Sequence, residues 1–94
     1  HELSHLLFES LNEMDKSDFR NQAQWERIAG GIWKLNRPAN QSLTTHSRRS
    51  PDEDFATSVD YFVFDPATLK RKVPRIHDWI LKKLGDRLKK GGDK

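Results

Sequence analysis

The sequence predicts one mainly α-helical domain with four to five helices. Apolar residues recur at three- and four-residue spacing along much of the chain, which is the pattern of amphipathic helices. Pro51 and Pro74 open two of these segments, and proline is favoured at the first position of a helix. The 94 residues contain no cysteine, so we expect one small domain without disulfide bonds or thiolate metal ligands.

The apolar content is low for a domain that folds alone. Hydrophobic residues make up 34% and charged residues 33% of the chain, and a domain of this size buries a limited fraction of its surface. We therefore expect residues 1–94 to be a fragment of a longer protein that packs against the remainder. No apolar run approaches the length needed to cross a bilayer, so no membrane span is expected.

The net charge of +3 is unevenly distributed along the chain. Residues 1–65 carry 7 basic and 11 acidic side chains, whereas residues 66–94 carry 10 basic and 3 acidic ones. Such a basic segment, here residues 70–90 with the basic tail 82–94, can bind nucleic acid or an anionic surface. Because its basic residues lack interleaved exposed aromatic side chains, we prefer a solvated helix face and do not expect a nucleic-acid partner.

In the N-terminal half, residues 1–14 are expected to form a helix, followed by a turn at 15–18. The apolar stripe of this helix contains Leu3, Leu6, Leu7, Leu11 and Met14. A second helix is expected over 21–29, because Trp25, Ile28, Ala29 and Ile32 keep helical spacing. Gly30-Gly31 should end it. The polar stretch 34–50 has no clear period and is predicted to be a loop.

In the C-terminal half, three helices have clear start signals. Ser50 is suited to cap a helix whose first residue is Pro51. Asp65-Pro66 repeats this signal for a short helix to about Lys70. Pro74 opens the last helix, which Gly91-Gly92 should stop. The expected buried face of this last helix contains Ile76, Trp79, Ile80, Leu84 and Leu88.

The first five residues, His1-Glu2-Leu3-Ser4-His5, form an HExxH motif. Residues four apart lie above one another on a helix, so His1 and His5 can bind one metal ion. Zinc suits this arrangement, because it accepts imidazole nitrogens and leaves a position open for water in catalytic sites. Glu2 is then placed to act as the general base. The alternative is an amphipathic helix with two surface histidines.

A catalytic zinc site of this type needs a third protein ligand. The candidates in this sequence are His46, Glu53, Asp54, Asp60 and His77. The stretch from Ser50 to Ala56 favours Glu53, because a carboxylate in the first turn of a helix can project towards a facing helix. The acids at 52–54 could equally serve only to complement the helix dipole. His77 is expected to be a surface histidine.

The sequence also resembles a family of zinc metallopeptidases related to the catalytic domain of anthrax lethal factor and to Mlc titration factor A. This family combines HExxH with a later P-x-E-D-F-A-E helix, an aromatic pair and D-P-x-x-L. The chain has PDEDFAT at 51–57, Tyr61-Phe62 and DPATL at 65–69. Its segment QWERIAGG at 24–31 resembles the tryptophan-bearing segment between the two helices. The resemblance covers about residues 1–81.

The resemblance implies that residues 1–94 are the helical part of an α+β zincin-like catalytic domain, with a small sheet before the active helix. It implies Zn²⁺ held by His1, His5 and Glu53, with Glu2 as general base. The expected activity is that of a zinc endopeptidase acting on peptide or protein substrates. The alternative is a non-catalytic zinc-binding domain for protein interaction, which would not need Glu2.

Two positions depart from the family pattern. His46 stands seven residues before Glu53, where family members have a tyrosine placed to stabilise the oxyanion. A histidine could donate to the same charge, or it could face water in a loop. Thr57 stands where the family has a carboxylate that orients a ligand histidine from behind. Asp60 is the candidate to replace that carboxylate.

Overall fold

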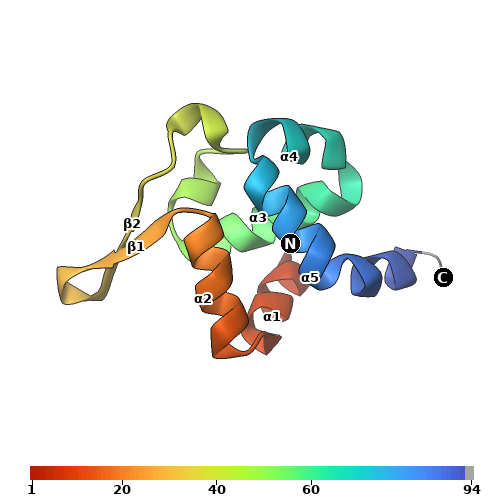
Figure 1. Cartoon of the computed structure of the whole chain (residues 1–94), viewed down its shortest axis with the longest axis horizontal. Coiled ribbons are helices and arrows are strands. Elements are labelled where there is room, and N and C mark those ends of the chain that lie inside the picture. The colour runs from red at the N-terminus through yellow and green to blue at the C-terminus, as the bar shows by residue number, and fades with distance from the viewer. Residues whose placement is uncertain (93–94) are drawn as a thin grey trace.

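The computed structural model describes the backbone of residues 1–92 and the side chains of residues 1–85. The helices are α1 (Glu2–Ser10), α2 (Glu13–Gln22), α3 (Pro51–Phe64), α4 (Pro66–Lys72) and α5 (Pro74–Gly92) (Figure 1). Between α2 and α3 lie strands β1 (Trp25–Ile28) and β2 (Ile32–Leu35) and the short 3-10 helices η1 (Ala29–Gly31), η2 (Ala39–Gln41) and η3 (His46–Arg48). The prediction of a mainly helical fold is confirmed.

Helix α3 is the element that the other helices share. It packs against α1, α4, α5 and η3, while α2 packs against α5 and β1. The hairpin of β1 and β2 extends away from the helical body (Figure 1). A site that draws on α1, α3 and η3 is therefore built on the most central part of the fold.

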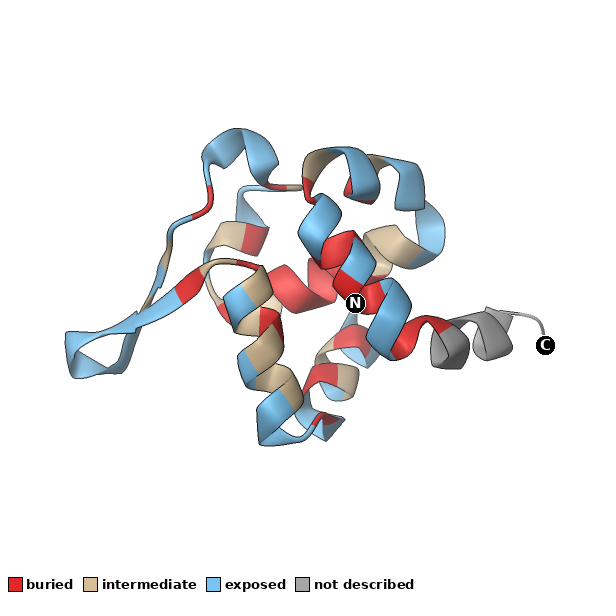
Figure 2. Cartoon of the chain, in the orientation of Figure 1, coloured by how far each residue is buried: buried red, intermediate tan, exposed pale blue. Residues whose placement is uncertain are grey.

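The core is an aromatic cluster between the helices. Phe55 of α3 has its ring centroid 4.8 Å from that of Phe8 and 5.2 Å from that of Phe19. The rings of Phe19 and Trp79 lie 5.5 Å apart. Buried residues gather where the helices meet (Figure 2), and Val59, Leu69, Ile76, Ile80 and Leu84 complete the core. These contacts fix how α1 lies against α3.

The prediction of one helix over 1–14 was wrong. Helix α1 ends at Ser10, and Leu11 has an extended backbone with φ −70° and ψ 148°. Asn12 then caps α2, its side chain accepting from the amide of Asp15 at 2.7 Å. Residues 15–18, expected to be a turn, belong to α2. The asparagine cap starts a new helix where the apolar spacing alone predicted continuity.

The expected apolar stripe of the first helix was also partly wrong. Leu3, Leu6 and Met14 are 79%, 64% and 81% exposed. The face that packs inward instead contains Ser4 and Phe8. Phe8 is buried in place of these residues because its ring packs against Phe55 in the aromatic cluster. This contact joins distant parts of the chain.

The helix expected over 21–29 is instead a β-hairpin. Strands β1 and β2 pair antiparallel, with Trp25 opposite Leu35 and Ile28 opposite Ile32. Gly30 and Gly31 form the connection with φ of 79° and 75°, values that glycine adopts without a steric penalty. The tight turn therefore reverses the chain where a helix had been predicted, and β2 takes the start of the expected loop 34–50.

The predicted start signals of the last three helices are confirmed. Ser50 Oγ accepts from the amide of Glu53 at 3.3 Å, with Pro51 as the first residue of α3. Asp65 Oδ1 accepts from the amide of Thr68 at 3.3 Å at the start of α4. Helix α5 begins at Pro74.

The sequence predicted that the last helix ends at Gly91-Gly92, close to the end of the described residues. The stop at Gly91-Gly92 adjoins 93–94, which lie outside the described residues, as do the side chains of Leu88 and of most of the basic tail 82–94. Within the described part of the chain, no helix has the length and apolarity needed to cross a membrane.

Candidate metal centre

Three side chains from two helices converge at one end of α3. His5 lies in α1, His1 is the N-cap residue of the same helix, and Glu53 lies in the first turn of α3. One ligand atom from each of these residues lies within 4.8 Å of the other two. His5 Nε2 is 2.8 Å from Glu53 Oε1, and His1 Nε2 is 3.4 Å from Glu53 Oε2. His5 and Glu53, which are 48 positions apart in the sequence, thus lie side by side in the fold.

The helical spacing of α1 aligns the two imidazoles. The amide of His5 donates to the carbonyl of His1 at 3.1 Å, so the two residues lie one turn apart on the same face. Their rings meet edge to face, with centroids 4.8 Å apart. Packing of Phe8 against Phe55 then turns this face of α1 towards α3.

Asp60 contacts the ring nitrogen of His1 that does not face Glu53, and this contact orients the imidazole. Its Oδ2 lies 2.7 Å from His1 Nδ1, and its Oδ1 accepts from Ser4 Oγ at 2.7 Å. A carboxylate at Nδ1 favours the tautomer that carries the proton there, which leaves the Nε2 lone pair available to a metal. Asp60 reaches this position because seven residues, about two helical turns, separate it from Glu53.

Thr57, the other residue considered for this role, lies elsewhere. Its side chain is 6% exposed, and it makes no side-chain hydrogen bond to any residue that the structure describes. The structure therefore brings Asp60, and not Thr57, to the imidazole of His1.

His46 lies beside the three donors without joining them. It is the first residue of η3, and its Nε2 contacts Glu53 Oε2, the same oxygen that faces His1. Its side chain is 52% exposed. The ring centroids of His46 and His1 are 6.5 Å apart. The side chain thus lies at the edge of the centre, open to water and to any ligand there.

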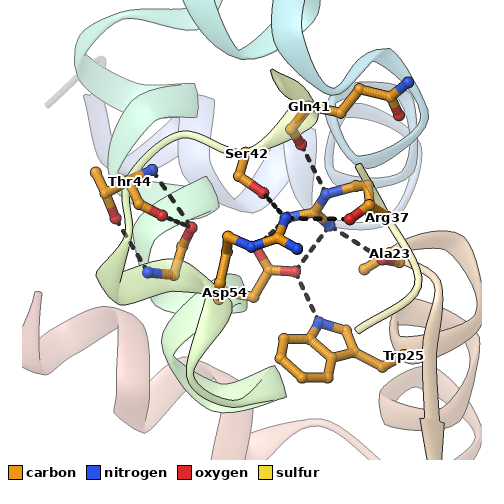
Figure 3. A network of polar contacts seen from close by, with 9 residues as sticks. Ala23, Trp25, Arg37, Gln41, Ser42, Thr44 and Asp54 are labelled. Carbon is orange, nitrogen blue, oxygen red and sulfur yellow. Dashed lines mark hydrogen bonds and ion pairs between the residues drawn. The ribbon is translucent and has the colours of Figure 1, made fainter. Parts of the chain in front are cut away.

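Asp54, one of the residues considered as a third ligand, is instead bound by Arg37 and Trp25. Both of its oxygens accept from Arg37, at 2.9 Å each, and Oδ2 also accepts from Trp25 Nε1 at 2.8 Å (Figure 3). The side chains of Arg37 and Asp54 are 3% and 1% exposed. This buried pair leaves Asp54 no part in the metal centre, whereas the adjacent Glu53 lies with His1 and His5.

The same arginine anchors the segment that carries His46. Arg37 Nε donates to the carbonyl of Gln41 at 2.7 Å, and Nη1 donates to that of Ala23 at 3.0 Å (Figure 3). Arg48 Nη1 donates in turn to the carbonyl of Arg37 at 3.1 Å and to Ser42 Oγ at 2.7 Å. The expected loop is therefore held by a polar network, which no local sequence signal indicated.

His77 does not belong to this centre, and its predicted surface position was wrong. It is 9% exposed, its ring centroid lies 5.6 Å from that of Phe62, and its Nδ1 is 3.1 Å from Asp78 Oδ1. The start of α5 packs this side of the helix onto α3, which buries the ring.

Glu2 begins α1 next to His1 and is exposed. It forms no side-chain hydrogen bond or ion pair with the residues that the structure describes.

A cavity of about 450 Å³ beside the centre is lined by both polar and apolar side chains, including His1, Asp60, Leu7 and Val59. Of the residues at the centre, His1 and Asp60 line this cavity, whereas His5 and Glu53 are not among its lining residues.

The donor set fits a zinc ion. Two imidazole nitrogens and one carboxylate are the protein ligands of one common type of catalytic zinc site. The hydrogen bond that His1 Nδ1 donates to Asp60 supports the imidazole in the way that is usual for metal-ligating histidines. No protein-family model, curated protein or solved structure matches the chain.

Proposed function

We propose that the chain is the catalytic part of a zinc-dependent endopeptidase. The observation that carries this proposal is the convergence of His1, His5 and Glu53, with ligand atoms within 4.8 Å of one another. The hydrogen bond between Asp60 and His1 supports it, because an imidazole held by a carboxylate is a better metal ligand. A surface pair of histidines would not need either arrangement.

When bound, zinc would supply a Lewis acid that activates a water molecule at neutral pH. Glu2, exposed and without a partner in the described part of the chain, takes the proton of the attacking water and passes it to the leaving amine. His46 donates to the oxyanion that develops on the scissile carbonyl, for which its Nε2 exchanges its contact with Glu53 Oε2. Asp60 keeps His1 in one tautomer and one orientation throughout.

A second function is a zinc-binding domain that contacts another protein without hydrolysis. The observation that favours it is that Leu3 and Phe64, 79% and 84% exposed, line the same cavity as His1. Exposed apolar residues of this kind mark interaction surfaces. Glu2 separates the two functions, because a purely structural zinc site has no use for a general base.

The test is a Glu2→Gln variant of the zinc-loaded chain, assayed on a quenched fluorescent peptide library. Loss of the general base should lower hydrolysis by about 10²- to 10⁴-fold while the bound zinc stays unchanged. Glu9→Gln is the matched control, because Glu9 is an exposed acid of the same helix, and it should keep full activity. Full hydrolysis by Glu2→Gln would refute the assignment of the base. A zinc-loaded chain that cleaves no peptide would favour the interaction domain.

A further inference from the structure

A second cavity lies away from the metal centre, where α2, the segment after β2 and the junction of α4 and α5 meet. Its volume is about 250 Å³. None of His1, His5 and Glu53 is among its lining residues. Whatever this cavity binds is therefore separate from the proposed hydrolysis.

Every charged side chain that lines this cavity is a cation. Arg71, Lys72 and Arg75 come from α4 and α5, and Arg37 contributes from the buried network. Arg37 is neutralised by Asp54. Within residues 1–85, whose side chains are described, the other three form no ion pair. Arg71 and Arg75 are exposed and Lys72 is half-buried, so water screens part of their mutual repulsion, and a bound anion would reduce what remains.

The start of α5 also borders this cavity. This 19-residue helix has no acidic residue in its first turn, and Val73 before it has no polar side-chain atom to act as a cap. The first amide that meets a helical acceptor is that of His77, which donates to the carbonyl of Val73 at 3.0 Å. The amides of Arg75 and Ile76, both lining residues, precede it. Unpaired amides at a helix start favour an anion.

Two glutamines complete the polar lining. Gln22 accepts from Arg75 Nε at 3.3 Å, which holds the guanidinium at the wall of the cavity while its terminal nitrogens remain available. Gln24 and Gln22 each carry amide donors as well. The lining thus offers charged and neutral donors to one ligand.

We propose that this cavity binds an oxyanion of phosphate size, presented either as a phosphate group or as a carboxylate. Guanidinium, ammonium and backbone amide groups are the donors that both anions accept, and their charge-assisted hydrogen bonds are short and strong. A volume of about 250 Å³ has room for such a group with some of its waters. Arg37, one of the lining residues, is already fixed by Asp54 and by the carbonyls of Gln41 and Ala23 (Figure 3).

The experiment is a titration of the ¹⁵N-labelled chain with inorganic phosphate and, separately, with acetate, followed by amide chemical shifts. Sodium chloride keeps the ionic strength constant. We expect saturable shifts at the amides of Arg75 and Ile76 with at least one of the two anions, and the stronger binder identifies the source of the oxyanion. Shifts that appear equally with chloride alone, or no saturation with either anion, would overturn the proposal.

Two variants separate a built site from general attraction to a basic surface. Arg75→Gln should weaken binding by on the order of tenfold, because it removes a charged donor from the cavity wall. Lys70→Gln removes the same charge from an exposed position of α4 outside the lining, and it should change binding less than about twofold. Equal weakening by both variants would show diffuse attraction and contradict the proposed site. A well-dispersed amide spectrum of each variant checks that it is folded.

Discussion

Replacing Asp60 by alanine should weaken zinc binding by about 10- to 100-fold, the range measured when a hydrogen-bond partner of a metal ligand is removed. The structure gives two reasons for this size. The substitution removes the 2.7 Å contact with His1 Nδ1, which selects the tautomer, and the 2.7 Å hydrogen bond from Ser4, which fixes the carboxylate. Because the Asp60 side chain is 29% exposed, water screens part of its charge, and we expect the lower half of that range.

The assay is competition for zinc with a chromophoric chelator, at one pH and with the thermal unfolding of each variant recorded. Asp60→Asn keeps the shape and removes the charge, so its zinc affinity should fall between those of the wild type and Asp60→Ala. Thr57→Val is the control, since Thr57 is buried on the same helix without a described side-chain hydrogen bond. Zinc affinity unchanged by Asp60→Ala, or lowered equally by Thr57→Val, would refute the role assigned to Asp60.

Three further predictions concern the core and the site. Arg37→Met leaves Asp54 charged and buried, at 1% side-chain exposure, and should lower the free energy of unfolding in urea by about 3–5 kcal/mol; a loss under about 1 kcal/mol would contradict the buried pair. Phe55→Ala, at 0% exposure, should cost about 3–5 kcal/mol in the same assay, whereas Phe64→Ala, at 84% exposure, should cost about 0.5 kcal/mol or less. His46→Ala should keep zinc, measured by elemental analysis, and lower kcat of peptide hydrolysis by about 10²- to 10³-fold; unchanged kcat would place His46 outside the reaction.

The helix starts could be predicted because their chemistry is local. Ser50 and Asp65 cap the backbone three residues ahead of them, and Pro51 fits the first helical position wherever the rest of the chain lies. The mainly helical class followed from the same short-range signals.

The hairpin could not be predicted by the same reasoning. Trp25, Ile28 and Ile32 suit one face of a helix by spacing, and strands of four residues are too short to show a clear alternation. The positive φ of Gly30 and Gly31 turns the chain back, yet a glycine pair also fits a helix end. Local spacing left both outcomes open, and the contacts of β1 with α2 belong to the tertiary structure.

For the candidate site, sequence spacing could bring His1 and His5 together but could not choose among the acids. The choice between Glu53 and Asp54 depends on Arg37, which lies 17 residues before Asp54 and pairs with it only in the folded chain. The contact of Asp60 with His1 spans 59 residues. Such pairings depend on how α1 and the segment after β2 pack on α3, which a pattern of residues does not contain.

The most direct test of the central claim is the zinc content of the purified chain by elemental mass spectrometry, beside Glu53→Ala and Asp52→Ala. The proposed centre predicts about one zinc per chain, lost in Glu53→Ala and kept in Asp52→Ala, because Asp52 is an exposed acid of the same turn outside the donor group. A wild-type chain without zinc, or zinc retained in full by Glu53→Ala, would contradict the centre and return the HExxH motif to a helix with two surface histidines.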